Sequence, residues 1–293
     1  HDAIEAIHTG IHYTPKYVLD ADIAKCFDRI NHDALLAKLN TFPLVRRLIK
    51  GWLKAGVMDG ETLFPTEEGT PQGGVISPLL ANIALHGMET AIMNAFPRTV
   101  RIDGRAYGHW QPRVIRYADD FVILHRDLGV IEEAKRQAEI WLQGMGLELK
   151  PSKTRITHTL HEHNGHVGFD FLGFTIRQFP VGKTHWRSGG GNGRTLDFIT
   201  LTRPSKKAIE KHYQRIADVV DNFKAAPQVA LIKHLNLIIR GWCNYYATGA
   251  SKRTFSRMDH LLNRKLLRWV RRRHPKKSMK KILGISSNYC RRI

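Results

Sequence analysis

The segment 113–125 constrains the fold of this chain most, because it places two acids between two strongly apolar arms. Its sequence, RVIRYADDFVILH, predicts a β-hairpin with a tight turn at Ala118-Asp119-Asp120. The segment 16–23, KYVLDADI, predicts another strand with Asp20 and Asp22 on one face. Carboxylates among apolar neighbours are costly unless a cation or a metal ion neutralises them. Each acidic pair also has an ordinary explanation, since aspartate is common in turns and a half-exposed strand tolerates it.

Taken together, acids on two separate strands indicate one kind of chemistry. Carboxylates from different strands can hold two Mg²⁺ ions about 4 Å apart, which activate an attacking hydroxyl and stabilise a leaving phosphate. Phosphoryl transfer of this kind depends on placed charge more than on a protein nucleophile. Oxygen ligands without a cysteine–histidine cage favour Mg²⁺ over Zn²⁺.

Helices are expected around these strands. Asn31 has the position of a helix N-cap, and Ser77-Pro78 predicts the start of a helix that continues toward Phe96. Apolar residues at three- and four-residue steps predict a helix that begins near Ile131 and ends near Gly144 or Gly146. The further expected strands are 155–159 and 169–177.

The last third of the chain is a polycation. Residues 201–293 hold 23 basic and four acidic side chains, whereas residues 1–200 hold 23 and 22. The glycine-rich segment 188–194 is expected to be a hinge region, and the apolar stripes after it predict helices. We therefore expect an α+β domain over 1–185 and a basic helical domain over 186–293. This charge distribution predicts nucleic acid as the partner, rather than an anionic membrane.

Composition excludes several other classes. With 42% hydrophobic and 25% charged residues, the chain is expected to be globular. The sequence has no run of about 18 apolar residues, so no membrane span is predicted. The cysteines, Cys26, Cys243 and Cys290, lie far apart and indicate a reducing compartment, a bacterial cytoplasm or an organellar matrix. The histidines between 158 and 166 are expected to lie in a loop rather than to bind metal.

Several sequence blocks resemble the group II intron reverse transcriptase/maturase family. Tyr117-Ala118-Asp119-Asp120 resembles the YxDD box of reverse transcriptases, and Asp22-Ile23 followed by Phe27 resembles the first catalytic motif of their palm. Further blocks resemble this family in order and spacing, namely GTPQGG (69–74) with VISPLLANIALHGMET after it, GLELKPSKT (146–154), FLGF (171–174) and RGWCNYY (240–246), the last like maturase domain X.

The resemblance implies a right-hand polymerase fold and an activity. It implies a palm with partial fingers over 1–185 and an all-helical basic thumb, domain X, over 186–293. Such a protein would be an RNA-directed DNA polymerase, a nucleotidyltransferase that extends a DNA primer 3′-hydroxyl with dNTPs on an RNA template, using two Mg²⁺ ions. It would also bind group II intron RNA and assist the splicing and mobility of that retroelement.

The resemblance also implies roles for individual residues. Asp22, Asp119 and Asp120 would be the catalytic carboxylates, and with the Ile23 carbonyl they would be the metal ligands. The expected nucleotide-binding residues are Lys25, Cys26, Phe27 (a gate against the ribose 2′-hydroxyl), Pro71, Gln72, Gly73 and Lys153 (near the leaving pyrophosphate). The expected primer grip is Phe171, Leu172, Gly173 and Phe174. Charge indicates RNA contacts at Arg257, Arg264, Lys265, Arg268, Arg271 and Arg272.

Some features depart from the family pattern or leave alternatives. Asp20 matches no catalytic position of the family and is interpreted as local structure. Trp242, Tyr245 and Tyr246 share one helical face and are expected to pack the bundle. Relatives carry finger segments before the point where this chain opens, and many carry DNA-binding and endonuclease modules after the thumb, which we expect to be missing from this chain. The alternatives are a splicing maturase with a mainly structural palm, and a CRISPR-associated or retron-type reverse transcriptase.

Overall fold

The structure is a computed structural model, and the chain divides into two compact units. The first consists of His1–Phe171 with Arg177–Thr200, and the second of Leu172–Ile176 with the chain from Leu201 onward. Within the described residues, no helix is both long and apolar enough to span a membrane. The structure describes residues 1–55, 69, 76–181 and 196–278, and the backbone of 57–59, 62–64, 188–189 and 194–195.

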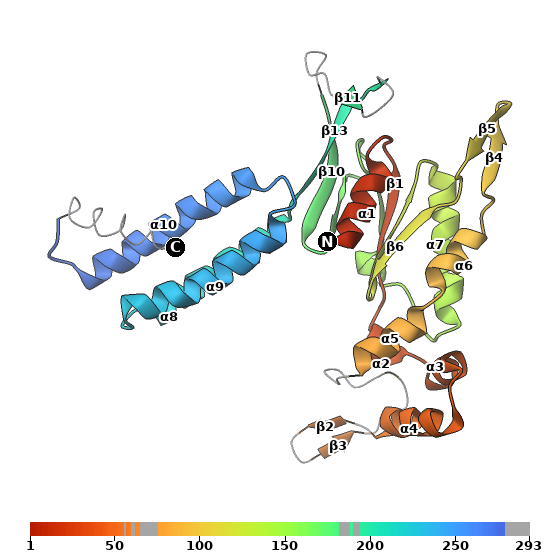
Figure 1. Ribbon diagram of the computed structural model, residues 1–293, viewed down its shortest axis with the longest axis horizontal. Helices are drawn as coiled ribbons and strands as arrows, with labels where there is room; N and C mark the ends of the chain where they lie inside the picture. Colours follow the sequence, from red (N-terminus) through yellow and green to blue (C-terminus); the bar gives the residue numbers. More distant parts are fainter. Residues whose placement is uncertain are drawn as a thin grey trace. The chain divides into compact units, whose positions relative to one another are not determined.

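Figure 1 shows both units and labels many of their helices and strands. The first unit contains α1 (Asp2–Ile11), β1 (Tyr17–Asp22), α2 (Cys26–Arg29), α3 (His32–Leu39), α4 (Pro43–Lys54), β2 (Val57–Asp59), β3 (Thr62–Phe64), α5 (Ser77–Leu85), α6 (Met88–Asn94), β4 (Thr99–Ile102), β5 (Arg105–Gly108), β6 (Arg113–Tyr117), β7 (Asp120–His125), α7 (Leu128–Gln143), the 3₁₀ helix η1 (Pro151–Lys153), β8 (Arg155–His158), β9 (Phe169–Phe171), β11 (Ser188–Gly189) and β12 (Arg194–Thr195). Strands β10 (Phe174–Pro180) and β13 (Phe198–Pro204) have residues in both units, and the second unit continues with α8 (Lys206–Asn222), α9 (Gln228–Tyr246) and α10 (Lys252–Arg273).

The central sheet of the first unit contains both of the acidic segments. Among the described residues it has four strands in the order β6-β7-β1-β8. Both neighbours of β1 run antiparallel to it, and its register against β7 extends from Tyr17 opposite His125 to Asp22 opposite Asp120. Strands β6 and β7 form the predicted hairpin, and Ala118 in its turn has a φ of 56°.

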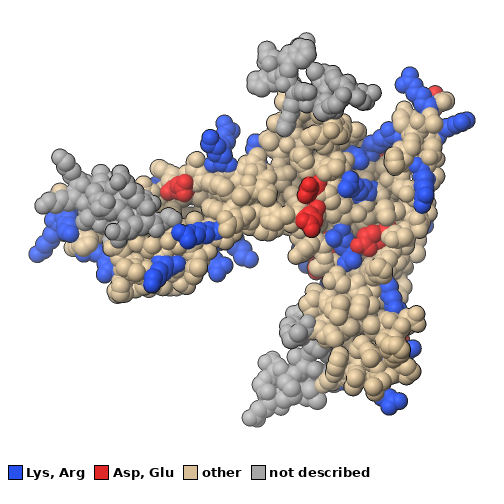
Figure 2. Space-filling view, in the orientation of Figure 1, with Lys and Arg blue, Asp and Glu red and all other residues tan. Residues whose placement is uncertain are grey.

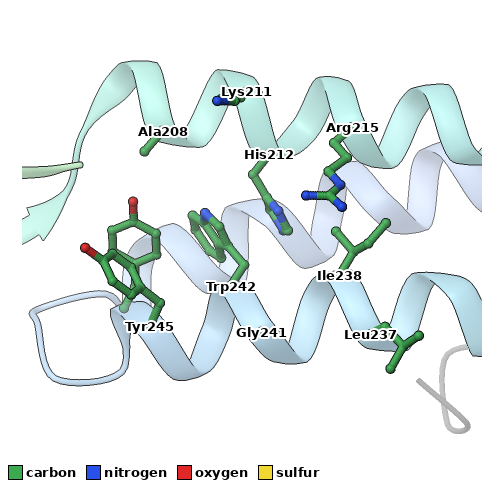
Figure 3. A pocket seen from close by; sticks show the side chains of 10 residues that line it. Ala208, Lys211, His212, Arg215, Leu237, Ile238, Gly241, Trp242 and Tyr245 are labelled. Carbon is green, nitrogen blue, oxygen red and sulfur yellow. The ribbon is translucent and has the colours of Figure 1, made fainter. Parts of the chain in front are cut away.

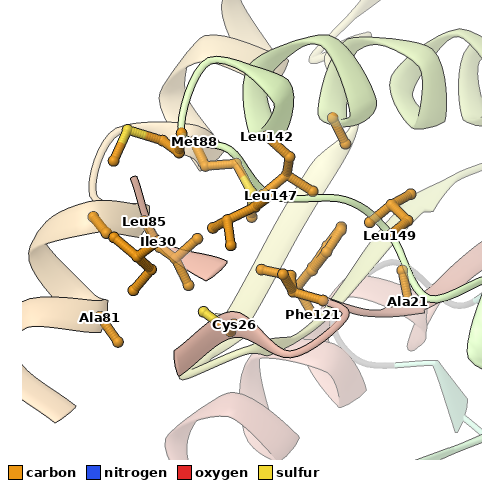
Figure 4. Close-up of a cluster of buried hydrophobic side chains, with 14 of the residues drawn as sticks. Ala21, Cys26, Ile30, Ala81, Leu85, Met88, Phe121, Leu142, Leu147 and Leu149 are labelled. Atoms are coloured by element: carbon orange, nitrogen blue, oxygen red, sulfur yellow. The ribbon is translucent and has the colours of Figure 1, made fainter. Parts of the chain in front are cut away.

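One face of this sheet packs against helices and forms the main core of the first unit. Leu19 and Ala21 of β1 and Phe121 of β7 contribute the strand side of this core. Met88 of α6 and Leu142 of α7 are among the helix residues that cover them, as Figure 4 shows for part of the cluster. The alternation along β1 therefore directs one set of side chains into the core and leaves Asp20 and Asp22 on the other face.

The predicted helix starts are partly confirmed. Asn31 is an N-cap, because its side chain accepts a hydrogen bond from the amide of Ala34. Helix α5 begins at Ser77, as predicted, although its N-cap is Ile76 and the side chain of Ser77 is buried.

The predicted helix from Ser77 toward Phe96 is wrong as a single element. The chain forms α5 and α6, and between them Gly87 has a φ of 88°, outside the helical region. Likewise, the strand predicted over 169–177 is two strands, because Leu172 and Gly173 both have positive φ and reverse the chain between β9 and β10. In both cases a residue with positive φ interrupts the predicted element. Apolar periodicity alone does not reveal where such a residue will occur.

The second unit confirms the prediction of a helical domain. Helices α8, α9 and α10 enclose one apolar core, which includes Ile216, Leu235 and Leu266. The indole of Trp269 on α10 donates a hydrogen bond to the carbonyl of Phe223, 3.0 Å away. The chain is thus an α+β unit followed by a basic helical unit.

Candidate active site and nucleic-acid surfaces

The register of the sheet brings the predicted acids to one end of it. Asp22 is the last residue of β1 and Asp120 the first of β7, and the two are direct cross-strand partners. Tyr117, at the end of β6, also pairs with Asp120, so Asp119 lies in the two-residue turn beside them. Asp22 and the Asp119–Asp120 pair, nearly a hundred positions apart in sequence, therefore meet at one end of the sheet.

A lysine reaches the same end of the sheet from another segment. The amide of Lys150 donates to the carbonyl of Asp22 at 2.8 Å, which holds the chain before η1 against the end of β1. Lys153 of η1 then places its Nζ 2.6 Å from Oδ2 of Asp22. The side chain of Lys153 is 58% exposed and that of Asp22 is 13% exposed. The hydrogen bond to Asp22 raises the pKa of Lys153.

The acids leave a surplus of negative charge that a single lysine does not neutralise. Burial, followed by the charges of Asp119 and Asp22, raises the pKa of Asp120 to about 6, while Lys153 opposes this rise. Burial first and then Asp119 also raise the pKa of the Cys26 thiol to about 12. The beginning of α2 thus lies within the electrostatic field of the same acids.

The donor set of this site fits a hard divalent cation. Carboxylate and carbonyl oxygens are the ligands of Mg²⁺. Ile23 faces Leu149 in an isolated bridge whose hydrogen bonds are made by the neighbouring residues, so its carbonyl points to the opposite side of β1, where β7 lies. In the described part of the chain, no three His, Cys, Asp or Glu side chains are gathered closely enough to hold a metal ion, and the Asp22 carboxylate is paired with Lys153.

The residues predicted to line the nucleotide lie at α2. Lys25, the N-cap of α2, has a φ of 45°, Cys26 is buried and Phe27 packs partly against the core. Of the predicted loop residues, Pro71, Gln72 and Gly73 lie outside the described residues.

Gly69, at the start of that loop, is held against α2. Its amide donates to the carbonyl of Ile30 at 2.9 Å, and Nε2 of His32 lies 2.6 Å from its carbonyl oxygen. Its φ is 81°, and a Cβ at this position would lie 2.5 Å from the carbonyl oxygen of Phe27. Sequence reasoning missed His32, since no local pattern connects it to a residue 37 positions away.

Asp20, interpreted from sequence as local structure, forms an ion pair. Nε and Nη2 of Arg155 donate to its Oδ2 at 3.0 and 2.9 Å, across the β1–β8 pair. Burial raises the pKa of Asp20, and Arg155 opposes that rise. Asp20 therefore has a cation of its own, separate from the Lys153 that pairs with Asp22.

The second unit holds three of the four predicted primer-grip residues. Tyr245 donates its hydroxyl to the carbonyl of Leu172 at 2.9 Å, and the ring of Phe174 lies 5.4 Å from that of Tyr245 and 4.7 Å from that of Tyr246. The two tyrosines therefore pack against this turn as well as against each other, and Tyr246 also packs against Trp242 in the bundle. Trp242 does pack within it. Phe171 belongs to the first unit.

The predicted RNA-binding residues on α10 are of two kinds. Arg257, Arg264, Arg268 and Arg271 are exposed and recur at steps of seven, four and three, so they lie along one helical face. Lys265 instead places its Nζ 2.8 Å from Oδ2 of Asp221. The last member of the predicted set, Arg272, is also exposed. Figure 2 shows basic side chains over this unit.

A groove of about 530 Å³ lies between α8 and α9 of the second unit. Figure 3 shows the Trp242 ring stacked beside that of His212, with centroids 4.3 Å apart and planes at 7°. Lys211 and Arg215 line the same groove from α8, a feature that sequence reasoning did not single out. Burial lowers the pKa of His212 to about 4. The groove therefore combines aromatic surface with cations.

Comparisons with known proteins match both units. Residues 3–176 match the model for "Reverse transcriptase (RNA-dependent DNA polymerase)", and residues 209–284 match "Group II intron, maturase-specific domain". The group II intron-encoded protein LtrA of Lactococcus lactis is 26% identical over 88% of this chain and 53% of its own length. Protein YkfC of Escherichia coli K12 is 30% identical over 55% of this chain and 47% of its own.

The chain thus spans about half the length of these curated relatives. Among solved structures, apo telomerase from Candida tropicalis matches with a TM-score of 0.44 and 16% identity, over 60% of this chain and 36% of that chain.

Proposed function

This chain belongs to the reverse transcriptase family and carries the maturase-specific domain of group II introns, and from that premise we propose that it is an RNA-directed DNA polymerase. It extends a DNA primer on an RNA template with dNTPs. We assign 1–185 to fingers and palm and 186–293 to the thumb. The observation that carries the proposal is the pairing of Asp22 with Asp120, with Asp119 in the adjoining turn.

The acids supply the charge that phosphoryl transfer requires. Asp22, Asp119, Asp120 and the carbonyl of Ile23 would hold two Mg²⁺ ions, which when bound supply activation of the primer hydroxyl and charge stabilisation at the phosphate. Lys153, whose amine pairs with Asp22, would hold a proton and a positive charge near the leaving pyrophosphate.

Further residues orient the substrates. Phe27 forms an apolar wall that excludes a ribose 2′-hydroxyl, and the amides of Lys25 and Cys26 face the triphosphate. By the family resemblance, Pro71, Gln72 and Gly73 would contact the nucleotide and the template. The tetrapeptide 171–174 holds the primer, supported by the bond from Tyr245 to Leu172.

A second candidate function is RNA splicing by a maturase that binds group II intron RNA, and it does not need the carboxylates. The row of arginines along one face of α10 favours it, since guanidinium groups at regular spacing suit a phosphate backbone. The match of residues 209–284 to a maturase-specific domain supports the same function. The two functions can coexist in one chain.

The test measures primer extension on an RNA template and intron splicing with the same variants. Asp119→Ala should lower extension about a thousandfold, because it removes charge placed for the transition state. Splicing should survive this change. Asp20→Asn is the matched control, since it removes an acid from the same sheet whose partner is Arg155.

The opposite results would refute the assignments. Extension that persists in Asp119→Ala, or that fails equally in Asp20→Asn, contradicts the proposed site. A wild-type chain that assists splicing but extends no primer contradicts the polymerase and leaves the maturase function. Loss of splicing in Asp119→Ala, with an unchanged unfolding midpoint, contradicts a splicing function independent of the carboxylates.

A further inference from the structure

The end of the central sheet opposite the acids gathers cations. Arg113 is the first residue of β6, Arg126 follows the last residue of β7, and Lys16 precedes the first residue of β1. The register places Tyr17 opposite His125, so Lys16 and Arg126 extend neighbouring strands at the same end. We name Lys16, Arg113 and Arg126 the cationic cluster. At about 3.3 Å per residue, it lies roughly 20 Å from Asp22.

Among the described residues, the cationic cluster has no acidic partner. None of its three members forms an ion pair within the part of the chain that the structure describes. The nearest acid in sequence, Asp127, caps α7, because its Oδ1 accepts a hydrogen bond from the amide of Val130. Burial, and after it the charges of Arg113 and Arg126, lower the pKa of Lys16, as expected for cations held close together.

The cluster is held in place by its surroundings. The guanidinium carbon of Arg126 lies 4.1 Å from the ring centroid of Tyr107 and 4.5 Å from that of Trp110. The amide of Lys16 donates to Oγ1 of Thr159 at 2.9 Å, which fixes the start of β1. Stacking restricts the arginine side chain while its charge remains exposed, so less side-chain entropy is lost when it binds an anion.

The β4–β5 hairpin extends this basic surface. Tyr107 belongs to β5, so the ring that carries Arg126 is part of the hairpin. Arg101 and Arg105 are exposed on it. Figure 2 shows blue side chains gathered over the hairpin, at the upper right of the view. The positive surface is thus wider than a site for a single small anion.

We propose that the cationic cluster, together with the β4–β5 hairpin, binds the phosphodiester backbone of a nucleic acid at the end of the sheet opposite the candidate active site. Planar guanidinium groups match phosphate oxygens in pairs. An acidic protein partner would also need apolar anchors, but Trp110 is only 8% exposed and Ile102 is the hairpin's one exposed large hydrophobic residue among those described. This inference does not depend on catalysis.

The test compares two variants of equal net charge. Lys16→Gln/Arg113→Gln/Arg126→Gln removes the cluster. Lys135→Gln/Arg136→Gln/Lys206→Gln removes three cations that already pair with Glu139, Glu133 and Glu210. Binding of fluorescein-labelled oligouridylate and oligothymidylate is measured by anisotropy at several salt concentrations, without nucleotides or divalent ions, so that failure of polymerase activity does not affect the result.

The cluster variant should lose roughly tenfold or more in affinity for at least one of the two oligonucleotides. The magnitude of the slope of log K against log salt should fall by about 2, since each of the three lost phosphate contacts removes about 0.7. The control should keep both values. Equal binding by the two variants would overturn the proposal. So would the result that polyglutamate binds the wild-type protein as tightly as either oligonucleotide does. Arg113→Gln alone, an exposed single change, should show about a third of the slope effect if the triple variant does not fold.

Discussion

Replacing Gly69 by alanine should destabilise the first unit by about 2 kcal/mol. At a φ of 81°, an L-residue costs about 1 kcal/mol more than glycine. The added Cβ would also lie 2.5 Å from the carbonyl oxygen of Phe27 and from the carbonyl carbon of Asp28, and these backbone atoms cannot rotate away. Moving residue 69 away from α2 costs less free energy than keeping it in place against these atoms.

The hydrogen bonds lost when residue 69 moves away from α2 determine how much stability Gly69→Ala loses. This movement breaks the bond from the Gly69 amide to Ile30 and the bond between His32 and the Gly69 carbonyl, each worth about 1 kcal/mol. It also frees the start of the loop that carries the predicted nucleotide residues. Primer extension should therefore fall much more than the loss of about 2 kcal/mol in stability would explain.

Urea unfolding and single-nucleotide extension measure the two effects. Gly165→Ala is the control, since Gly165 has a φ of 77° and a Cβ there would meet nothing within 4 Å. It should cost about 1 kcal/mol and leave extension unchanged. If Gly69→Ala loses no more stability than Gly165→Ala and extends primers at the wild-type rate, then the contact between Gly69 and α2 does not organise the site.

Two further predictions concern titratable residues. Lys153→Met should lower stability by less than about 1 kcal/mol, because its side chain is 58% exposed, yet it should abolish most extension; an unchanged rate would remove Lys153 from the site. His212 is buried, and its pKa in the folded protein is about 4. Between pH 6.5 and 4, the imidazole is therefore protonated in the unfolded chain but neutral in the folded protein. As pH falls from 6.5 to 4, wild type should therefore lose about 3 kcal/mol relative to His212→Phe, which keeps the stack on Trp242. Parallel urea stabilities across this range would contradict the reasoning.

Local patterns were sufficient to predict β1, the β6–β7 hairpin and the helical second unit. Alternation over 16–23 gave the inward and outward faces of β1, and the Asn31 cap follows from side-chain chemistry within three residues. These features depend on neighbours in sequence, where periodicity carries the information.

The contacts that complete the site could not be predicted in this way. The bond from Lys153 to Asp22 joins residues 131 positions apart, and the stacking of Arg126 on Tyr107 depends on where a separate hairpin packs. The break at Gly87 depends on one backbone angle, which the apolar pattern of α5 and α6 does not encode. Each of these features is set by tertiary packing rather than by local preference.

The pairing of Asp22 with Asp120 is itself a product of packing. Like charges placed directly across two strands repel each other by up to about 1 kcal/mol, so the acids do not select this register. A slip of one residue would turn Leu19 and Ala21 out of the core, and a fully buried leucine alone is worth about 2 kcal/mol. The apolar face of β1 therefore fixes the register, and that register holds the carboxylates together at one end of the sheet and the cationic cluster at the other.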